Sequence, residues 1–400
     1  MVSQLDRRQA LKLFAGLGAA ATVPGLAACS GSSLSGDSGT GSSGGPVKIG
    51  MLAPQSGVYK VIGDDMINGF NLYLELHDNK LGGREVDLVI ADEGETADSG
   101  RTGAEKLLKQ DKVLAMTGVV SSAVMGAIVD LVETEQVPLV GSNASPTTLQ
   151  GATYIWRTSY VNDEPGKALG AYLGRTLKGT VYCIAADYQA GKDEVNGLLS
   201  TLPKEKLHSD PVYTPFAPNP TTNFQPYLTA IKQSSAEAVF CFYAGSSAVD
   251  FVKQYKQFGV NKPLYAPGFL TEGKVIESQG DAALGIFTSL NYAPDLDNPT
   301  NRTFASEYQK RAGWGIPTTY AMASYDAAAV LDKAIAIAGD DLSPQSVNAA
   351  ISKIGQIDSP RGSWQFNQNR TPLQKWYLRE VRRDGAVLSN VLVSELTTLG

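Results

Sequence analysis

Residues 48–76 read KIGMLAPQSGVYKVIGDDMINGFNLYLEL, a short apolar run followed by a longer amphipathic one. The first run, Lys48 to Leu52, has the length and composition of a β-strand. From Asp64 to Leu76 the apolar residues recur at the three- to four-residue spacing of one helix face. A strand followed by a helix is the unit of a parallel α/β sheet, so this stretch predicts the fold class.

The same unit repeats along the chain. In the first series we expect strands at 86–91, 113–117 and 137–140 and helices at 98–110 and 122–133. In the second series we expect helices at 163–176, 192–199, 223–233 and 248–258 and strands at 180–185, 211–216, 238–243 and 263–266. Helices at 303–312 and 320–338 and a strand pair at 376–381 and 387–392 follow. The two series predict an α/β protein with two doubly wound parallel-sheet lobes.

Composition excludes several classes of function. A chain of 400 residues exceeds the size of one ordinary core, which agrees with two lobes. With 34 basic and 40 acidic residues the net charge is −6, so no basic field for nucleic acid is available. His77 and His208 are the only histidines, which removes the usual ligands of zinc sites and the base of most hydrolytic triads. We therefore expect no catalysis, no metal and no cofactor.

The N-terminal segment has the features of an export signal. Arg7, Arg8 and Lys12 precede an uncharged run from residue 13 to 28, which is too short to span a bilayer comfortably. The arginine pair resembles a twin-arginine signal, although ordinary secretion stays open. Leu26-Ala27-Ala28-Cys29 resembles a bacterial lipobox, in which the cysteine is acylated. We expect residues 1–28 to be a signal peptide and 29–46, rich in glycine and serine, to be a flexible lipid-anchored tether on the outer face of the cell membrane.

Several short motifs, in this order, resemble the branched-chain amino-acid (Leu/Ile/Val) type of periplasmic binding protein, the substrate-binding subunit of ABC importers. The resemblance covers about residues 47–393 and rests on the following stretches: Val47 to Gly50 with Ser56-Gly57 and Gly63, Gly118 to Ser122, Pro138 to Val140, Asn143 to Pro146, Trp156 to Thr158, Asn223-Phe224, Tyr325 to Ala327 and Arg361-Gly362. It implies a type I periplasmic binding protein whose lobes, joined by three crossover strands near Val161, Ser289 and Lys375, close on a small molecule. The expected limits are 47–161 with 290–374 for lobe 1 and 162–289 with 375–400 for lobe 2.

The resemblance also implies ligand-binding positions. Ser122 matches the family serine that holds the ligand carboxylate at a helix start, a place that favours an anion on physical grounds as well; Ser121 or Ser122 can equally cap that helix. Beside it the family threonine is missing, and Ser142, Asn143 and Ala144 offer an amide and backbone groups. Among the nearby aromatic residues, Tyr59 is the favoured contact, and we add Tyr188, Tyr243 and Phe269. Packing within one lobe is the alternative for each of these rings.

The second lobe departs from amino-acid binders. Gly268 stands where those members commonly place an acidic residue for the ammonium group. Glu272, four residues later, is expected to be an exposed carboxylate at a helix start. A carboxylate lacking the ammonium, such as an aromatic or 2-oxo acid, or a neutral amide, therefore stays open as the ligand.

The expected function is a lipid-anchored binding subunit that closes on a small amino acid or related carboxylate and delivers it to a permease, as a monomer. A sensor that signals to a membrane partner is the alternative, because the same closure serves both. Cys183 and Cys241 fall in strands that the predicted order places side by side, so a disulfide and two buried thiols are both considered.

Overall fold

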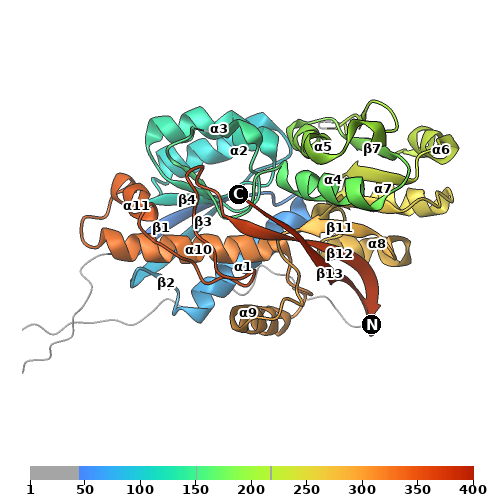
Figure 1. Ribbon diagram of the computed structural model, residues 1–400. Coiled ribbons are helices and arrows are strands. Elements are labelled where there is room, and N and C mark those ends of the chain that lie inside the picture. The colour runs from blue at the N-terminus through green and yellow to red at the C-terminus, as the bar shows by residue number, and fades with distance from the viewer. Residues whose placement is uncertain (1–44, 150, 217–218) are drawn as a thin grey trace, which may run out of the picture. The chain divides into compact units, whose positions relative to one another are not determined.

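The computed structural model describes residues 45–149, 151–216 and 219–400, which belong to one compact unit (Figure 1). The predicted signal peptide and Cys29, and almost all of the predicted tether, lie outside these residues. Within the described part of the chain, no helix is both long enough and apolar enough to cross a membrane.

The first sheet has six strands in the order β2-β3-β1-β4-β5-β6. Its strands are β1 (Val47–Ala53), β2 (Lys80–Leu81), β3 (Arg84–Asp92), β4 (Ala115–Gly118), β5 (Leu139–Gly141) and β6 (Ile155–Arg157). All neighbours are parallel except the short β2, which pairs antiparallel with β3. Its helices are α1 (Lys60–Leu76), α2 (Ala97–Glu105), α3 (Ser122–Glu135), α9 (Pro299–Gln309), α10 (Thr319–Ala338) and α11 (Pro344–Ile351).

Strand β1 shows why this sheet is covered on both faces. Side chains alternate between the faces of a strand. Ile49 and Met51 pack in the core made with α1 and α10, whereas Leu52 packs in the core made with α2 and α3. Alternating residues of this nearly continuous apolar run are therefore buried under helices on opposite faces of the sheet, as is typical of parallel sheets.

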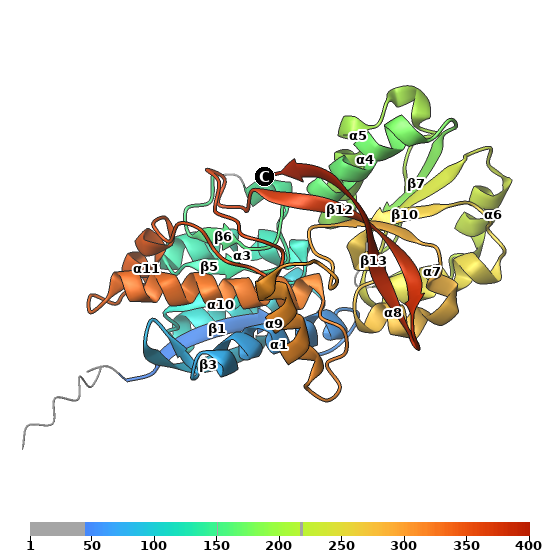
Figure 2. The ribbon, with the colours of Figure 1, turned by 60° about the horizontal axis from the view of Figure 1, so that its bottom comes forward.

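The second sheet has seven strands in the order β13-β12-β11-β10-β9-β7-β8. Its strands are β7 (Val181–Ala186), β8 (Val212–Thr214), β9 (Ala238–Phe242), β10 (Leu264–Pro267), β11 (Phe287–Leu290), β12 (Gln374–Asp384) and β13 (Val387–Leu399). Its helices are α4 (Glu164–Thr176), α5 (Gln189–Thr201), α6 (Gln225–Gln233), α7 (Gly245–Gln257) and α8 (Lys274–Gln279). The last two strands are antiparallel and form the long ribbon seen in Figure 2. The two mixed, mainly parallel sheets with helices confirm the predicted fold class.

Cys183 and Cys241 are free, buried thiols. Their strands are neighbours, as predicted, but the register pairs Cys183 with Phe240 and Ile184 with Cys241. This offset of one residue points the two sulfur atoms to opposite faces of the sheet, where they join different apolar cores. The disulfide alternative is therefore absent from this structure.

The chain passes three times between the two sheets, after β6, after β11 and before β12. Buried polar groups tie these passages together. The carbonyl oxygen of Ser159 accepts hydrogen bonds from Asn291 (2.9 Å), Gln374 (2.9 Å) and Arg361 (3.1 Å). Arg361 in turn forms a buried ion pair with Asp326, at 2.7 Å. We call Ser159, Asn291, Asp326, Arg361 and Gln374 the hinge network, and we keep the lobe limits given above as a proposal.

Most predicted elements are present, with shifted ends. Helix α1 begins one turn before the predicted Asp64, and α7 begins at Gly245 instead of Ala248. The sequence analysis missed the short elements β2, β6, α8 and α11, whereas β11 (Phe287–Leu290) lies where the resemblance implied a crossover strand near Ser289. Strands of two or three residues and helices of six or eight residues carry too little periodicity to be recognised.

Candidate functional site

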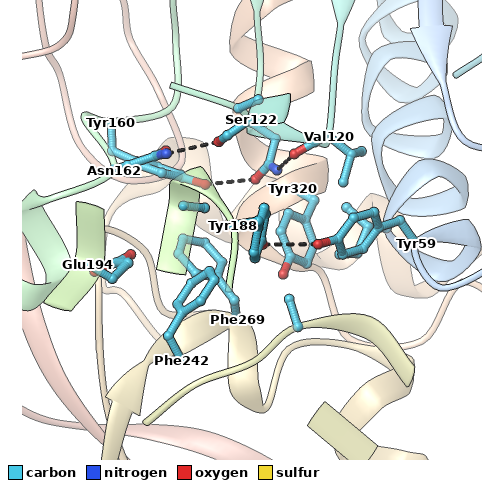
Figure 3. Close-up of a pocket in the computed structure, with 15 residues that line it drawn as sticks. Tyr59, Val120, Ser122, Tyr160, Asn162, Tyr188, Glu194, Phe242, Phe269 and Tyr320 are labelled. Atoms are coloured by element: carbon cyan, nitrogen blue, oxygen red, sulfur yellow. Dashed lines mark hydrogen bonds between the residues drawn. The ribbon is translucent and has the colours of Figure 1, made fainter. Parts of the chain in front are cut away.

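A pocket lies between the two sheets, where loops that follow β4, β5, β7, β9 and β10 meet (Figure 3). In this closed arrangement its cavity volume is about 20 Å³, which has room for about one water molecule. This is the place where open α/β sheets bind ligands, beyond the carboxyl ends of parallel strands. The lining residues are Tyr59, Ile62, Val120, Ser122, Asn143, Ala144, Tyr160, Asn162, Tyr188, Ala190, Glu194, Phe242, Ala244, Phe269 and Tyr320.

One wall is built around the start of α3. The loop before it turns through positive φ values at Gly118 (107°) and Val119 (67°). The buried carboxylate of Glu93 then accepts both the Val120 and Ser121 N–H groups, each at 2.7 Å. Burial raises the pKa of Glu93 to about 8, while these two hydrogen bonds act in the opposite direction. Glu93 thus fixes the loop and leaves the first-turn N–H groups of α3, which have no partner within the helix, to face other acceptors.

Ser122 is held so that its hydroxyl proton is available. Asn162 Nδ2 donates to Ser122 Oγ at 2.8 Å, so the serine oxygen already accepts one hydrogen bond. Its own hydrogen can therefore be donated into the pocket. Next to it, Asn143 Nδ2 donates to the Val120 carbonyl and Asn143 Oδ1 accepts from Tyr160 Oη, both at 2.9 Å. Both ends of the Asn143 amide are thus used to position the pocket wall.

The opposite wall is mostly aromatic. Tyr188, Phe242 and Phe269 come from the second sheet, and Tyr320 comes from the first turn of α10. Within the described residues the hydroxyl of Tyr320 is buried without a hydrogen-bond partner. The wall therefore offers ring faces and edges with few polar groups, which is typical of small-molecule pockets.

Glu194 is the only carboxyl group among the described lining residues, and none of these residues is lysine, arginine or histidine. Its side chain is 1% exposed, and Oε2 accepts from the Gly166 N–H at 3.0 Å. A Cβ at residue 166 would lie 2.1 Å from the Glu194 carbonyl oxygen, so only glycine lets α4 approach α5 this closely. Burial raises the pKa of Glu194 well above 4.5, and Asp163, Asp193 and Glu164 raise it further.

The two lobes touch around the pocket. Tyr59 Oη donates to Tyr188 Oη at 2.9 Å. Asp193 accepts from Thr147 N (3.2 Å) and Thr147 Oγ1 (2.9 Å). At α7 the Ser246 N–H donates to the Val58 carbonyl at 3.3 Å, and a Cβ at Gly245 would lie 2.2 Å from that oxygen. The structure therefore has the lobes closed on each other.

Six of the ten ligand-binding residues predicted from the sequence line this pocket. They are Tyr59, Ser122, Asn143, Ala144, Tyr188 and Phe269. The other four, Ser121, Ser142, Tyr243 and Gly268, do not line it. Ser121 serves as the N-cap position of α3 and Ser142 donates its N–H to Gly118.

Tyr243 and Gly268 face other parts of the second lobe. Tyr243 packs against Phe224 and Phe251, and its hydroxyl lies 3.2 Å from that of Thr214. A Cβ at Gly268 would meet Arg379 and Leu290. The expectation of an exposed Glu272 is wrong: this carboxylate is buried and lies 2.6 Å from Arg379.

The sequence analysis missed Asn162, Glu194 and Tyr320. Glu194 follows Ala190, which also lines the pocket, by four residues, and residues four apart share one helix face. Asn162 lies in the first passage between the sheets, and Tyr320 comes from a distant helix, so neither had a local signal.

Three comparisons identify the family. Residues 46–386 match the model of a periplasmic binding protein family. Over 347 residues the chain is 28% identical to the Leu/Ile/Val-binding protein homolog 6 of Brucella melitensis, covering 84% of this chain and 88% of the relative.

Solved structures agree. A solute-binding protein of an ABC transporter from R. palustris, in complex with benzoate, superposes with a TM-score of 0.80 at 28% identity, covering 88% of this chain and 98% of that one. A leucine-binding protein from Thermotoga maritima superposes with a TM-score of 0.76 at 22% identity, covering 86% and 99%. The chain belongs to the periplasmic binding protein family. Members of this family bind small molecules outside the cytoplasm for ABC transporters, and they are solute-binding proteins, not enzymes.

Proposed function

We propose that this chain is the substrate-binding subunit of an ABC importer and closes on a small amino acid or a related carboxylate. The observation that carries this proposal is the pocket between the sheets, with Ser122 and the start of α3 on one wall and aromatic rings on the other. A small acid fits this arrangement, because the helix start and the serine hydroxyl suit a carboxylate while the rings suit an apolar body.

Ligand-driven closure is the mechanism we propose. Tyr59–Tyr188 and Thr147–Asp193 join the lobes directly, and a ligand between Ser122 and the second lobe adds to these contacts only when the lobes are closed. Ligand therefore shifts the population toward the closed form, which the membrane permease recognises. A membrane-bound sensor would use the same closure and is the alternative reading.

Aromatic acids without an amino group are the second candidate ligand class. The R. palustris neighbour is in complex with benzoate, and another, also from R. palustris and 27% identical, is in complex with 4-hydroxybenzoate. The aromatic wall of Tyr188, Phe242 and Phe269 favours this class, since an aryl ring stacks well on such side chains.

The membrane attachment is also a proposal and rests on the lipobox alone. We expect Cys29 to carry the lipid and the protein to act as a monomer at the outer face of the membrane. Metabolic labelling with a tritiated fatty acid is expected to mark the wild type, and Cys29→Ser is expected to lose the label and release the protein into the soluble fraction. Unlabelled wild-type protein contradicts the anchor.

A stability screen tests the binding function. Residues 46–400 hold every described helix and strand; this part is unfolded, refolded to remove carried ligand and heated with amino acids, aromatic acids, 2-oxo acids, amides and sugars. A ligand at a hundredfold its Kd adds about 2.7 kcal/mol, which raises Tm by several degrees. Ser122→Ala is expected to weaken the binding of any carboxylate found, by roughly tenfold. A screen in which no carboxylate raises Tm contradicts the proposal.

A further inference from the structure

Glu194 is a buried carboxyl group, and the protein satisfies only part of its hydrogen-bonding capacity. Its Oε2 accepts one hydrogen bond, from the Gly166 N–H in the first turn of α4, where the helix dipole favours a negative charge. Its Oε1 is buried and has no hydrogen-bond partner among the described residues. Because Glu194 lines the pocket, this oxygen is available to a bound molecule.

Buried carboxyl groups with a structural role are better compensated in this protein. Both oxygens of Glu93 accept backbone N–H groups. Asp326 Oδ2 faces the guanidinium of Arg361 and also accepts from Ser359 and Trp364, although Asp326 Oδ1, like Glu194 Oε1, has no hydrogen-bond partner among the described residues. Glu194 has one N–H and no cation, and an unpaired buried acid is costly. A partner that arrives with the ligand explains why this arrangement persists.

The surroundings of Glu194 favour a cation. Asp163, Glu164 and Asp193 all act on it electrostatically. The nearby Lys167 is paired with Asp163, at 2.7 Å. Tyr160 and Tyr188, which line the pocket, also lie within the field of Glu194. Negative charge together with aromatic faces attracts an ammonium group.

Asn162 connects the wall that carries Ser122 to the helix that carries Glu194. Its Nδ2 contacts Ser122 Oγ at 2.8 Å and Asp193 Oδ2 at 3.2 Å, and Asp193 directly precedes Glu194 in α5. In Figure 3 Glu194 lies at the end of the pocket opposite Tyr59, with Asn162 and Ser122 above it.

We infer that Glu194 holds the amino group of the ligand, so that a carboxylate bearing an amino group spans from Ser122 to α5. This inference rests on the proposed function. It places the acidic anchor on α5 and assigns no ligand role to Gly268, which faces Arg379 and Leu290.

Matched ligand pairs test the assignment. The refolded protein is titrated by calorimetry with leucine against 4-methylpentanoate, phenylalanine against 3-phenylpropanoate, and benzoate. The wild type is expected to bind the amino acid of a pair more tightly by roughly ten- to a hundredfold, the value of a hydrogen bond to a charged group. In Glu194→Gln this ratio is expected to fall to about threefold or less.

Asp65→Asn is the control. Asp65 is also buried and burial also raises its pKa, to about 7, but it lies on α1, does not line the pocket and is not among the charges that act on Glu194. This variant is expected to keep the wild-type ratio. A ratio that survives in Glu194→Gln overturns the inference, and so does a wild type that prefers the acid without the amino group. In both cases the proposed function stands, whereas a protein that binds no member of the panel overturns both.

Proton release gives a second readout that a structural role would not produce. Burial raises the pKa of Glu194, and an ammonium partner beside it lowers that pKa again. Binding of the amino acid is then expected to release protons, measured from the dependence of the calorimetric enthalpy on the buffer. Glu194→Gln is expected to release none. A buffer-independent enthalpy in the wild type contradicts the assignment.

Discussion

The hinge network and the pocket each hold a buried acid, and they treat it differently. Asp326 forms an ion pair with Arg361 and accepts hydrogen bonds from Ser359 and Trp364. Glu194 accepts a single hydrogen bond, from the N–H of Gly166. The hinge network must hold three passages of the chain in every state of the protein, so its charge is neutralised permanently. The pocket must bind and release a ligand, so a polar group such as Glu194 Oε1 has no permanent partner among the described residues.

The largest expected effect comes from breaking the hinge pair. Arg361→Met leaves Asp326 buried without its cation and is expected to lower the free energy of unfolding by about 3–5 kcal/mol. Urea unfolding measures this loss. Lys375→Met removes an exposed pair with Glu395 and is expected to cost less than about 1 kcal/mol. Equal losses in the two variants would contradict the role given to the hinge network.

A smaller effect is expected at the contact between the lobes. Asp193→Ala removes the acceptor of both Thr147 hydrogen bonds, which exist only in the closed form. Ligand affinity is expected to fall by roughly five- to a hundredfold, or about 1–3 kcal/mol. Asp187→Ala, at an exposed pair with Lys192 in the same lobe, is the matched control. Unchanged affinity in Asp193→Ala would show that closure does not depend on this contact.

Three buried acids also predict a pH dependence. Burial raises the pKa of Glu164 and of Asp65 to about 7 and that of Glu194 well above 4.5. Between the ordinary value and the raised value the folded protein binds more protons than the unfolded chain, so stability falls as pH rises. Glu194→Gln is expected to make this fall of stability with pH shallower, because it removes one of the groups whose pKa is raised on folding. Urea unfolding from pH 5 to 8 measures it, and parallel slopes for the two proteins would refute the neutral state of Glu194.

The smallest effect is expected at Tyr59. Tyr59→Phe removes the hydroxyl that meets Tyr188 but keeps the ring, which packs near Phe216. Affinity for the ligand is expected to weaken by about two- to tenfold. Tyr213→Phe changes a partly buried tyrosine of the second lobe outside the pocket and is expected to leave the affinity unchanged. Affinity that is insensitive to Tyr59→Phe would show that the tyrosine pair contributes nothing to closure.

The sequence predicted those helices and strands in which apolar residues recur at a regular spacing. Strand β1 and helices α1 and α3 were recognisable because each carries a clear apolar pattern or begins at a serine. The sequence predicted those pocket residues that lie in loops directly after strands, namely Ser122, Asn143 and Tyr188. The side chain of Tyr243 could not be placed, because a shift of one residue at the end of β9 decides which face it joins. Asn162 lies in the first segment that connects the two sheets, and Tyr320 lies in α10. Only the three-dimensional structure shows that these two segments meet at the pocket.

The positions of Cys183 and Cys241 have a practical consequence. Burial raises the pKa of both thiols, that of Cys183 to about 12, so neither forms an accessible thiolate at neutral pH. In the protein that starts at residue 46 these are the only cysteines. A maleimide dye will therefore react selectively with a cysteine introduced on the surface, for example in place of Asp187 beside the pocket. The folded protein can thus be turned into a fluorescent reporter of its own ligand without removing a native thiol.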